Sequence, residues 1–109
     1  MATVSITAGM GGANGIATAG TVDQITCANF IPPTGFMVGV FPGEVGEVVV
    51  SVNPNLVGTA GDLNGGEPGY DGRDVIVTKS QLVRSGGKDN KTIYITALAG
   101  SVPYWVTVV

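Results

Sequence analysis

Thr92-Ile93-Tyr94-Ile95-Thr96 is the stretch that decides the fold class of this chain. In an extended segment, successive side chains point to opposite faces, so the two isoleucines share one face and their polar neighbours share the other. A strand with a single apolar face is typical of an antiparallel sheet that packs on a second sheet. Residues 3–7 alternate in the same way. The pattern therefore predicts an all-β protein.

Short runs rich in Val, Ile and Thr continue along the chain and are separated by Gly, Pro and Asn clusters. We predict seven strands from these runs, at residues 3–7, 21–27, 36–41, 47–52, 74–79, 92–98 and 104–109. The runs at 36–41 and 48–50 are apolar on both faces, which indicates central strands or strands that a partner covers. We expect the last strand, 104–109, to be an edge with which another chain could pair.

This spacing of strands and turns fits one antiparallel β-sandwich of the immunoglobulin-like type, with a jelly roll as the alternative. The lone Cys27 excludes an intrachain disulfide, so an immunoglobulin-like domain would here lack its usual cysteine pair. Because Cys27 falls in a predicted strand, we expect it to be a buried apolar side chain.

Two segments depart from the strand pattern. Residues 9–20 are rich in Gly and Ala, and residues 54–72 form a long Gly-rich stretch. Loops of this length inside a compact domain are usually functional or flexible. We therefore divide the chain into a flexible N-terminal arm at residues 1–20, which includes the first predicted strand, and a β-sandwich domain at residues 21–109.

Charged residues are unusually scarce. They make up 12% of the 109 residues, about half the usual ~25% of a soluble domain. A surface built from Thr, Ser, Asn, Gly and apolar groups suits assembly contacts. The net charge of −3 and the scattered Lys and Arg argue against nucleic acid and anionic membrane as partners. Residues 1–20 lack a basic leader followed by an apolar run, so we expect no signal peptide and no membrane span.

Enzyme chemistry is disfavoured by what the sequence lacks. Without His, neither a Ser-His-Asp nor a Cys-His arrangement can form, and His-ligated zinc is excluded. The phosphate-binding Gly-rich motifs are also missing. We expect a protein that is not an enzyme and needs no cofactor.

A cluster of acidic and amide side chains in and beside the long loop is the weak candidate for a metal site. An EF-hand would require Gly at the sixth position of the loop and Glu at the twelfth, where this chain has Glu67 and Arg73. An irregular calcium site and a solvated polar loop both remain open. The candidate ligands are Asp62, Asn64, Glu67 and Asp71.

In type, the chain resembles the small decoration, or cement, proteins of tailed-phage capsids. The resemblance lies in the length, the all-β pattern, the Met1-Ala2-Thr3 start and the Gly/Ala-rich N-terminal segment. It implies a virion structural protein, made in a host cytoplasm, that bridges capsomers as a homo-oligomer, commonly a trimer. Its partner would be a capsid or other structural protein.

Under this hypothesis the N-terminal segment lies along the capsid, and aromatic side chains supply further contacts. For Trp105, a position in the sandwich core is the competing interpretation to a surface contact. We expect Tyr70 to be exposed because its surroundings are rich in Gly. The residues predicted to interact are Thr3, Val4, Ile6, Met10, Ile16, Tyr70, Tyr104 and Trp105.

Two other functions remain open. The first is an immunoglobulin-like module of a phage tail or cell surface that binds carbohydrate or a receptor through Tyr70 and the acidic loop. The second is a filament subunit that exchanges strands through residues 106–109, which the expected lack of a secretion signal disfavours.

Overall fold

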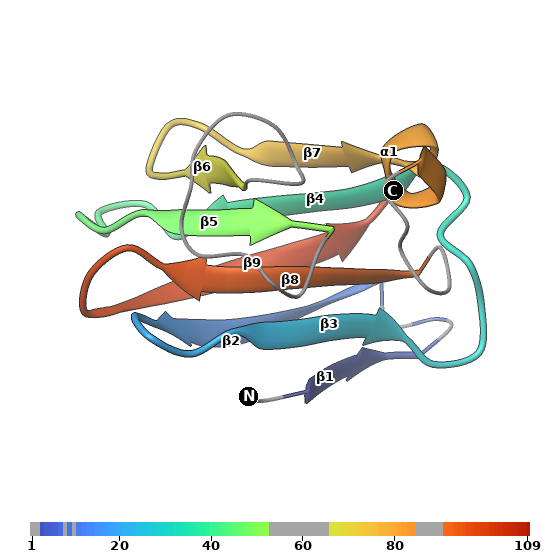
Figure 1. Ribbon diagram of the computed structural model, residues 1–109, viewed down its shortest axis with the longest axis horizontal. Coiled ribbons are helices and arrows are strands. Elements are labelled where there is room, and N and C mark those ends of the chain that lie inside the picture. The colour runs from blue at the N-terminus through green and yellow to red at the C-terminus, as the bar shows by residue number, and fades with distance from the viewer. Residues whose placement is uncertain (1–2, 8, 10, 53–65, 85–90) are drawn as a thin grey trace.

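Two stacked β-sheets form the protein in the computed structural model, which describes residues 3–7, 9, 11–52, 66–84 and 91–109. The described part contains nine strands and one short helix, and the sheets lie one behind the other in Figure 1. In chain order the elements are Thr3–Ile6 (β1), Gly12–Thr18 (β2), Asp23–Cys27 (β3), Gly35–Val40 (β4), Val48–Ser51 (β5), Glu67–Gly69 (β6), Val75–Thr78 (β7), Lys79–Arg84 (α1), Thr92–Ala97 (β8) and Ser101–Val108 (β9).

The strand order is that of one long antiparallel hairpin rolled into a sandwich. β2 pairs with β9, β3 with β8, β4 with β7 and β5 with β6. Pairing of β4 with β9 and of β5 with β8 closes the roll into sheets of order β1-β3-β8-β5-β6 and β2-β9-β4-β7. Eight antiparallel strands in two four-stranded layers are the jelly-roll arrangement, to which β1 adds a parallel strand beside β3. The predicted sandwich is confirmed, and its topology follows the jelly-roll alternative.

Each of the seven predicted strands corresponds to a strand of the structure, and two further strands are present. Of these, β2 falls in the segment that the sequence suggested as a flexible arm, and β6 in the long Gly-rich stretch. β2 is paired with β9 over its whole length, and its Ala17 is fully buried. Because Ile6 of β1 is fully buried as well, β1 and β2 both contribute to the sandwich itself.

The C-terminal strand is not the edge that the sequence suggested. β9 lies between β2 and β4 and is hydrogen-bonded to both. Strand exchange through residues 106–109 would therefore have to break an existing sheet. The filament interpretation loses its structural basis for this reason.

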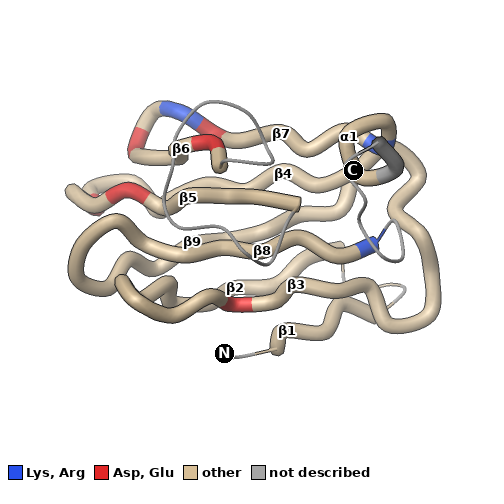
Figure 2. Tube along the Cα trace, viewed as in Figure 1, with Lys and Arg blue, Asp and Glu red and all other residues tan. Residues whose placement is uncertain are grey.

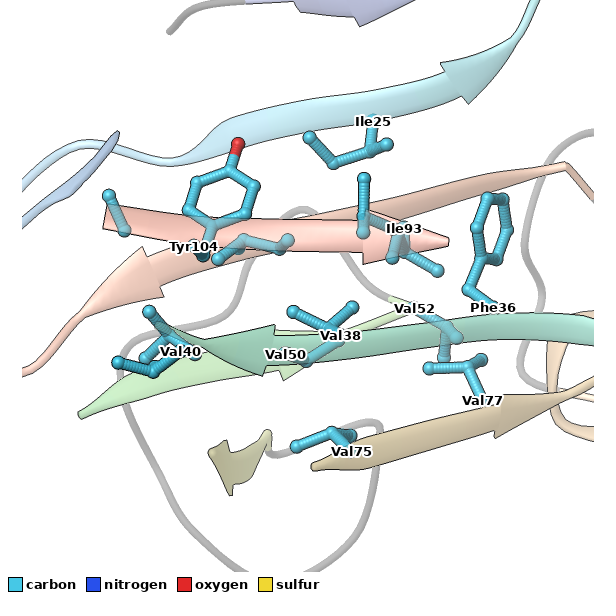
Figure 3. Packing of buried hydrophobic residues seen from close by; sticks show 14 of the residues in the cluster. Ile25, Phe36, Val38, Val40, Val50, Val52, Val75, Val77, Ile93 and Tyr104 are labelled. Carbon is cyan, nitrogen blue, oxygen red and sulfur yellow. The ribbon is translucent and has the colours of Figure 1, made fainter. Parts of the chain in front are cut away.

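The core lies between the sheets and consists of the inward side chains of both. Val, Ile, Phe36 and Tyr104 fill it, and Figure 3 shows members from each layer. Cys27 is among the fully buried residues, as predicted, and is a free thiol. The alternation of buried and exposed residues is clearest in β7 and β9, where every second side chain points inward.

One polar contact crosses the core from sheet to sheet. The Tyr104 hydroxyl on β9 donates a hydrogen bond to Asp23 Oδ2 on β3, at 3.1 Å, and both residues are buried. The end of the Tyr104 ring lies against the backbone of Gly15, where an added Cβ would come within 2.6 Å of Tyr104 Cζ. The glycine therefore provides the space that lets Tyr104 reach Asp23.

The helix α1, which the sequence pattern did not predict, begins with a capping box. The backbone N–H of Gln81 donates to Thr78 Oγ1 at 3.3 Å, and the backbone N–H of Thr78 donates to Gln81 Oε1 at 2.8 Å. The helix has only six residues. Within the described residues, no helix has the length and apolar character needed to cross a membrane.

Candidate functional site

Charged side chains are distributed very unevenly along the chain. Asp23 is the only charged residue among residues 1–43, and residues 92–109 contain none. Since Asp23 is 7% exposed and bonded to Tyr104, no residue of β1–β4, β8 or β9 places a charged side chain on an outer face. Figure 2 shows the other charged residues near β6 and β7, in the segment before β5, in α1 and just before β8.

The charge-free part includes an edge of the sandwich, which we call the N-terminal edge and define as β1 and β2. Among the described strands, β1 is outermost in one sheet and β2 in the other, and the two strands contact each other. Its exposed side chains are those of Thr3, Ser5, Asn14, Ile16 and Thr18, and Ile16 is 61% exposed. Sheet edges are commonly protected by Lys or Pro, and neither strand contains one.

The predicted N-terminal contact residues have different positions in this edge. Thr3 and Ile16 are exposed and free to meet a partner, whereas Val4 is partly buried. Ile6 is fully buried in the core and cannot serve as a surface contact, because β1 turns it toward the opposite sheet. Met10 lies outside the described residues.

The turn between β6 and β7, which we call the charged corner, is chemically the opposite of this edge. Tyr70 and Arg73 exchange two backbone hydrogen bonds across Asp71 and Gly72. The Arg73 guanidinium also meets Glu67 Oε2 at 3.2 Å. Asp71 Oδ2 accepts a hydrogen bond from the Gly43 amide at 3.1 Å. Tyr70 is 42% exposed at this turn.

The predicted metal ligands are not gathered into a site within the described part of the chain. Glu67 is paired with Arg73, and Asp71 is bonded to the Gly43 amide, so the two carboxylates have separate partners. No group of three or more His, Cys, Asp or Glu residues that could hold a metal occurs among residues 3–7, 9, 11–52, 66–84 and 91–109. Asp62 and Asn64 lie outside these ranges.

Two neighbouring aromatic residues of β9 face opposite ways. Tyr104 is fully buried, so it is a core residue and not a surface contact. Burial, with the nearby Asp23 carboxylate, raises the pKa of the Tyr104 phenol well above 10. Trp105 lies on the outer face of the sheet formed by β2, β9, β4 and β7, opposite Asn14 on one side and Gly39 on the other.

The Trp105 indole rests over the backbone of Gly39. A Cβ at Gly39 would collide with Trp105 Cε2 and Cζ2, and the same point lies 2.7 Å from Asp74 Oδ1. On the β2 side of the indole is an open hollow of about 500 Å³, lined by Gly11, Gly12, Ala13, Asn14, Trp105, Val106 and Thr107. A partly buried aromatic ring on the outer face therefore stands between an amide and a hydroxyl on one side and a carboxylate on the other.

No protein-family model, curated protein or solved structure matches this chain. The surfaces were nevertheless partly visible in the sequence. The run before Glu44, in which Asp23 is the one charged residue, contains the N-terminal edge. Val102, Tyr104 and Val106 alternate with their neighbours as buried residues, so Trp105 faces outward.

Proposed function

We propose that this protein decorates a viral capsid and stabilises the shell by bridging neighbouring capsomers through its N-terminal edge. The observation that carries the proposal is the lack of charge and of edge protection on β1 and β2. An exposed strand edge of this kind invites pairing with another chain. A protein that works with this edge covered has no need of a protecting Lys or Pro.

A further feature supports a role in assembly. Six of the described strands place no charged side chain of their own on an outer face, so a partner could cover most of this surface, away from Asp74 at Gly39, without desolvating ions. Apolar burial contributes only ~25 cal/mol per Å², so an edge this narrow gives a weak single contact. Many copies on one shell would sum such contacts by multivalency, and a homo-oligomer would increase the effect.

The test must leave the sandwich folded, which excludes deletion of the whole N-terminal segment, since Ile6 and Ala17 belong to the core. Ile16→Lys places a charge on the exposed side of the N-terminal edge. Ile76→Lys is the matched control, because Ile76 is 55% exposed on β7, at the opposite edge of the same sheet. Both variants should unfold at the same temperature as the unsubstituted protein, within a few degrees.

The measurement is the amount of each variant that sediments with particles from the cells that produce the protein. We expect Ile16→Lys to be lost from the particles and Ile76→Lys to be retained. Loss of Ile76→Lys alone would place the contact elsewhere. If the unsubstituted protein is not found with particles, the capsid function is wrong.

A binding module centred on Tyr70 and the acidic loop has less support. Tyr70 is exposed, but its turn neighbours are occupied by contacts with Glu67 and Gly43.

A further inference from the structure

The hollow beside Trp105 combines groups that seldom meet on a sheet face by chance. One flat aromatic ring lies at its wall, and backbone of two adjacent glycines forms part of its lining. Asn14 and Thr107 provide an amide and a hydroxyl on the hollow side, and Asp74 provides a carboxylate beyond the indole. The glycines keep side chains out of this space, so a ligand could approach the backbone closely.

We infer that this hollow is a binding site for a neutral saccharide, with the sugar ring stacked on Trp105. A sugar ring presents a face of C–H groups and a rim of hydroxyls. The indole offers a large rigid surface to the C–H face with little loss of conformational entropy. Asn14 and Thr107 line the hollow, where they can donate and accept hydrogen bonds with rim hydroxyls, and the Asp74 carboxylate lies beyond the indole at Gly39.

The charge of the site indicates which saccharides fit. The four strands of this sheet contain no charged residue, and Asp74 directly precedes β7. A sugar acid would meet a carboxylate without a basic side chain from these strands to pair with it. Recognition of a quaternary ammonium commonly uses a cage of several aromatic rings, whereas these strands present one outward ring, that of Trp105. An uncharged sugar is the remaining match.

A protein partner fits this hollow less well than a sugar does. The central part of a protein contact is a flush, water-excluding surface around an anchor residue. Trp105, the residue that would act as the anchor, instead borders an open space of about 500 Å³ with polar groups at its margin. This volume lies within the usual ~300–1,000 Å³ of small-molecule sites.

The chain contains a single Trp, so its fluorescence reports on this site directly. The probes are maltohexaose, cellohexaose and chitohexaose, titrated up to about 10 mM, with sialyllactose as the anionic comparison. We expect at least one neutral hexasaccharide to shift the Trp105 emission and to protect the ring from quenching by acrylamide. Sialyllactose should have little effect.

Variants then locate the binding. Trp105→Ala should weaken binding of the responding sugar about tenfold or more, measured by calorimetry because the fluorophore is gone. Trp105→Tyr should retain part of the affinity, since it keeps an aromatic surface, and it serves as the informative variant if Trp105→Ala does not fold. Asp74→Asn should weaken binding by a smaller factor. Tyr70→Ala is the matched control at the charged corner and should bind as the unsubstituted protein does.

Three results would overturn the inference. The first is no response to any neutral hexasaccharide in fluorescence and calorimetry. The second is binding that Tyr70→Ala removes while Trp105→Ala keeps. The third is a folded Trp105 variant that binds sugar with the same affinity as the unsubstituted protein but no longer joins particles. This result would assign the face to protein contact. The capsid assay with Ile16→Lys is independent, so failure of one proposal leaves the other standing.

Discussion

The N-terminal edge and the charged corner share one small sandwich but are built on opposite principles. At the corner, Arg73 contacts Glu67 and the Pro68 carbonyl of its own turn region, and Asp71 accepts a hydrogen bond from the Gly43 amide. At the edge, the exposed groups are hydroxyls, the Asn14 amide and Ile16, and the core beneath them is made by Ile6 and Ala17. A corner that satisfies its own polar groups is suited to water. An edge without charge is suited to being covered, although it also holds the fold together from inside.

The largest expected effect comes from removing the edge. Deletion of residues 1–19 should leave a chain without a cooperative thermal transition, because it takes away two strands and the buried Ile6 and Ala17. Losing even one such core side chain commonly costs about 2–5 kcal/mol, a large part of the stability of a small domain. Circular dichroism and calorimetry would measure this. A truncated chain that melts as the full chain does would show that residues 1–19 are an appended arm.

A smaller effect is expected where β2 accommodates the Tyr104 ring. Gly15→Ala should lower the free energy of unfolding by about 1–3 kcal/mol, because the new methyl group overlaps the end of a buried ring. Urea denaturation measures the loss, and Asn14→Ala, at an exposed position of the same strand, is the control. In a Tyr104→Phe background the same substitution should cost less, since the hydroxyl no longer competes for the space. Equal losses in both backgrounds would assign the effect to the β2 backbone.

Alkaline pH should weaken the sandwich through Tyr104. Its pKa is near 10 in the unfolded chain and is raised well above 10 in the fold by burial and by Asp23. The unfolded state therefore loses the proton first, so the stabilisation is complete below about pH 10 and declines as the pH rises above it, by up to about 1.4 kcal/mol per pH unit. Urea unfolding at increasing pH should show a shallower decline for Tyr104→Phe. Identical slopes would mean that other groups control the alkaline transition.

The smallest effect is expected at the charged corner. Arg73→Ala removes a partly exposed ion pair with Glu67, and such pairs contribute about 0–1 kcal/mol. The unfolding midpoint should barely move, and what change there is should diminish with added salt. A loss of several kcal/mol would show that the corner supports the fold as strongly as the edge does.

The contrast also explains what the sequence could reveal. The seven predicted strands contain local runs rich in β-branched or aromatic residues, and each corresponds to a strand of the structure. β2 lacks that signal because its residues are mainly Gly and Ala. It is a strand because it pairs with β9. The two strands lie so close that a Cβ at Gly12 would collide with the carbonyl oxygen of Val106, which is why this position has no side chain. Such a constraint arises from a segment about ninety residues away in the sequence, and local patterns do not contain it.

The functional surfaces were predictable to a similar degree. Ile16 and Tyr70 are exposed as expected, whereas Ile6 and Tyr104 are buried, since strand parity decides which neighbour faces the core. The hollow at Trp105 is lined by residues 11–14 and 105–107, which are about ninety residues apart in the sequence, so only the folded arrangement brings its parts together.

The rolled hairpin has a consequence for how the protein is made. In the sheet of order β2-β9-β4-β7, strand β9 lies between β2 and β4 and joins them. This sheet therefore cannot form until residues 101–108 have been synthesised. Until then β2 has no neighbour to pair with, and its partner lies at the largest sequence separation in the sandwich. Topologies dominated by such distant pairings fold slowly, over milliseconds to seconds. The nascent chain therefore passes through a period in which its early strands are unpaired, and uncharged segments in that state depend on dilution or chaperones to avoid aggregation.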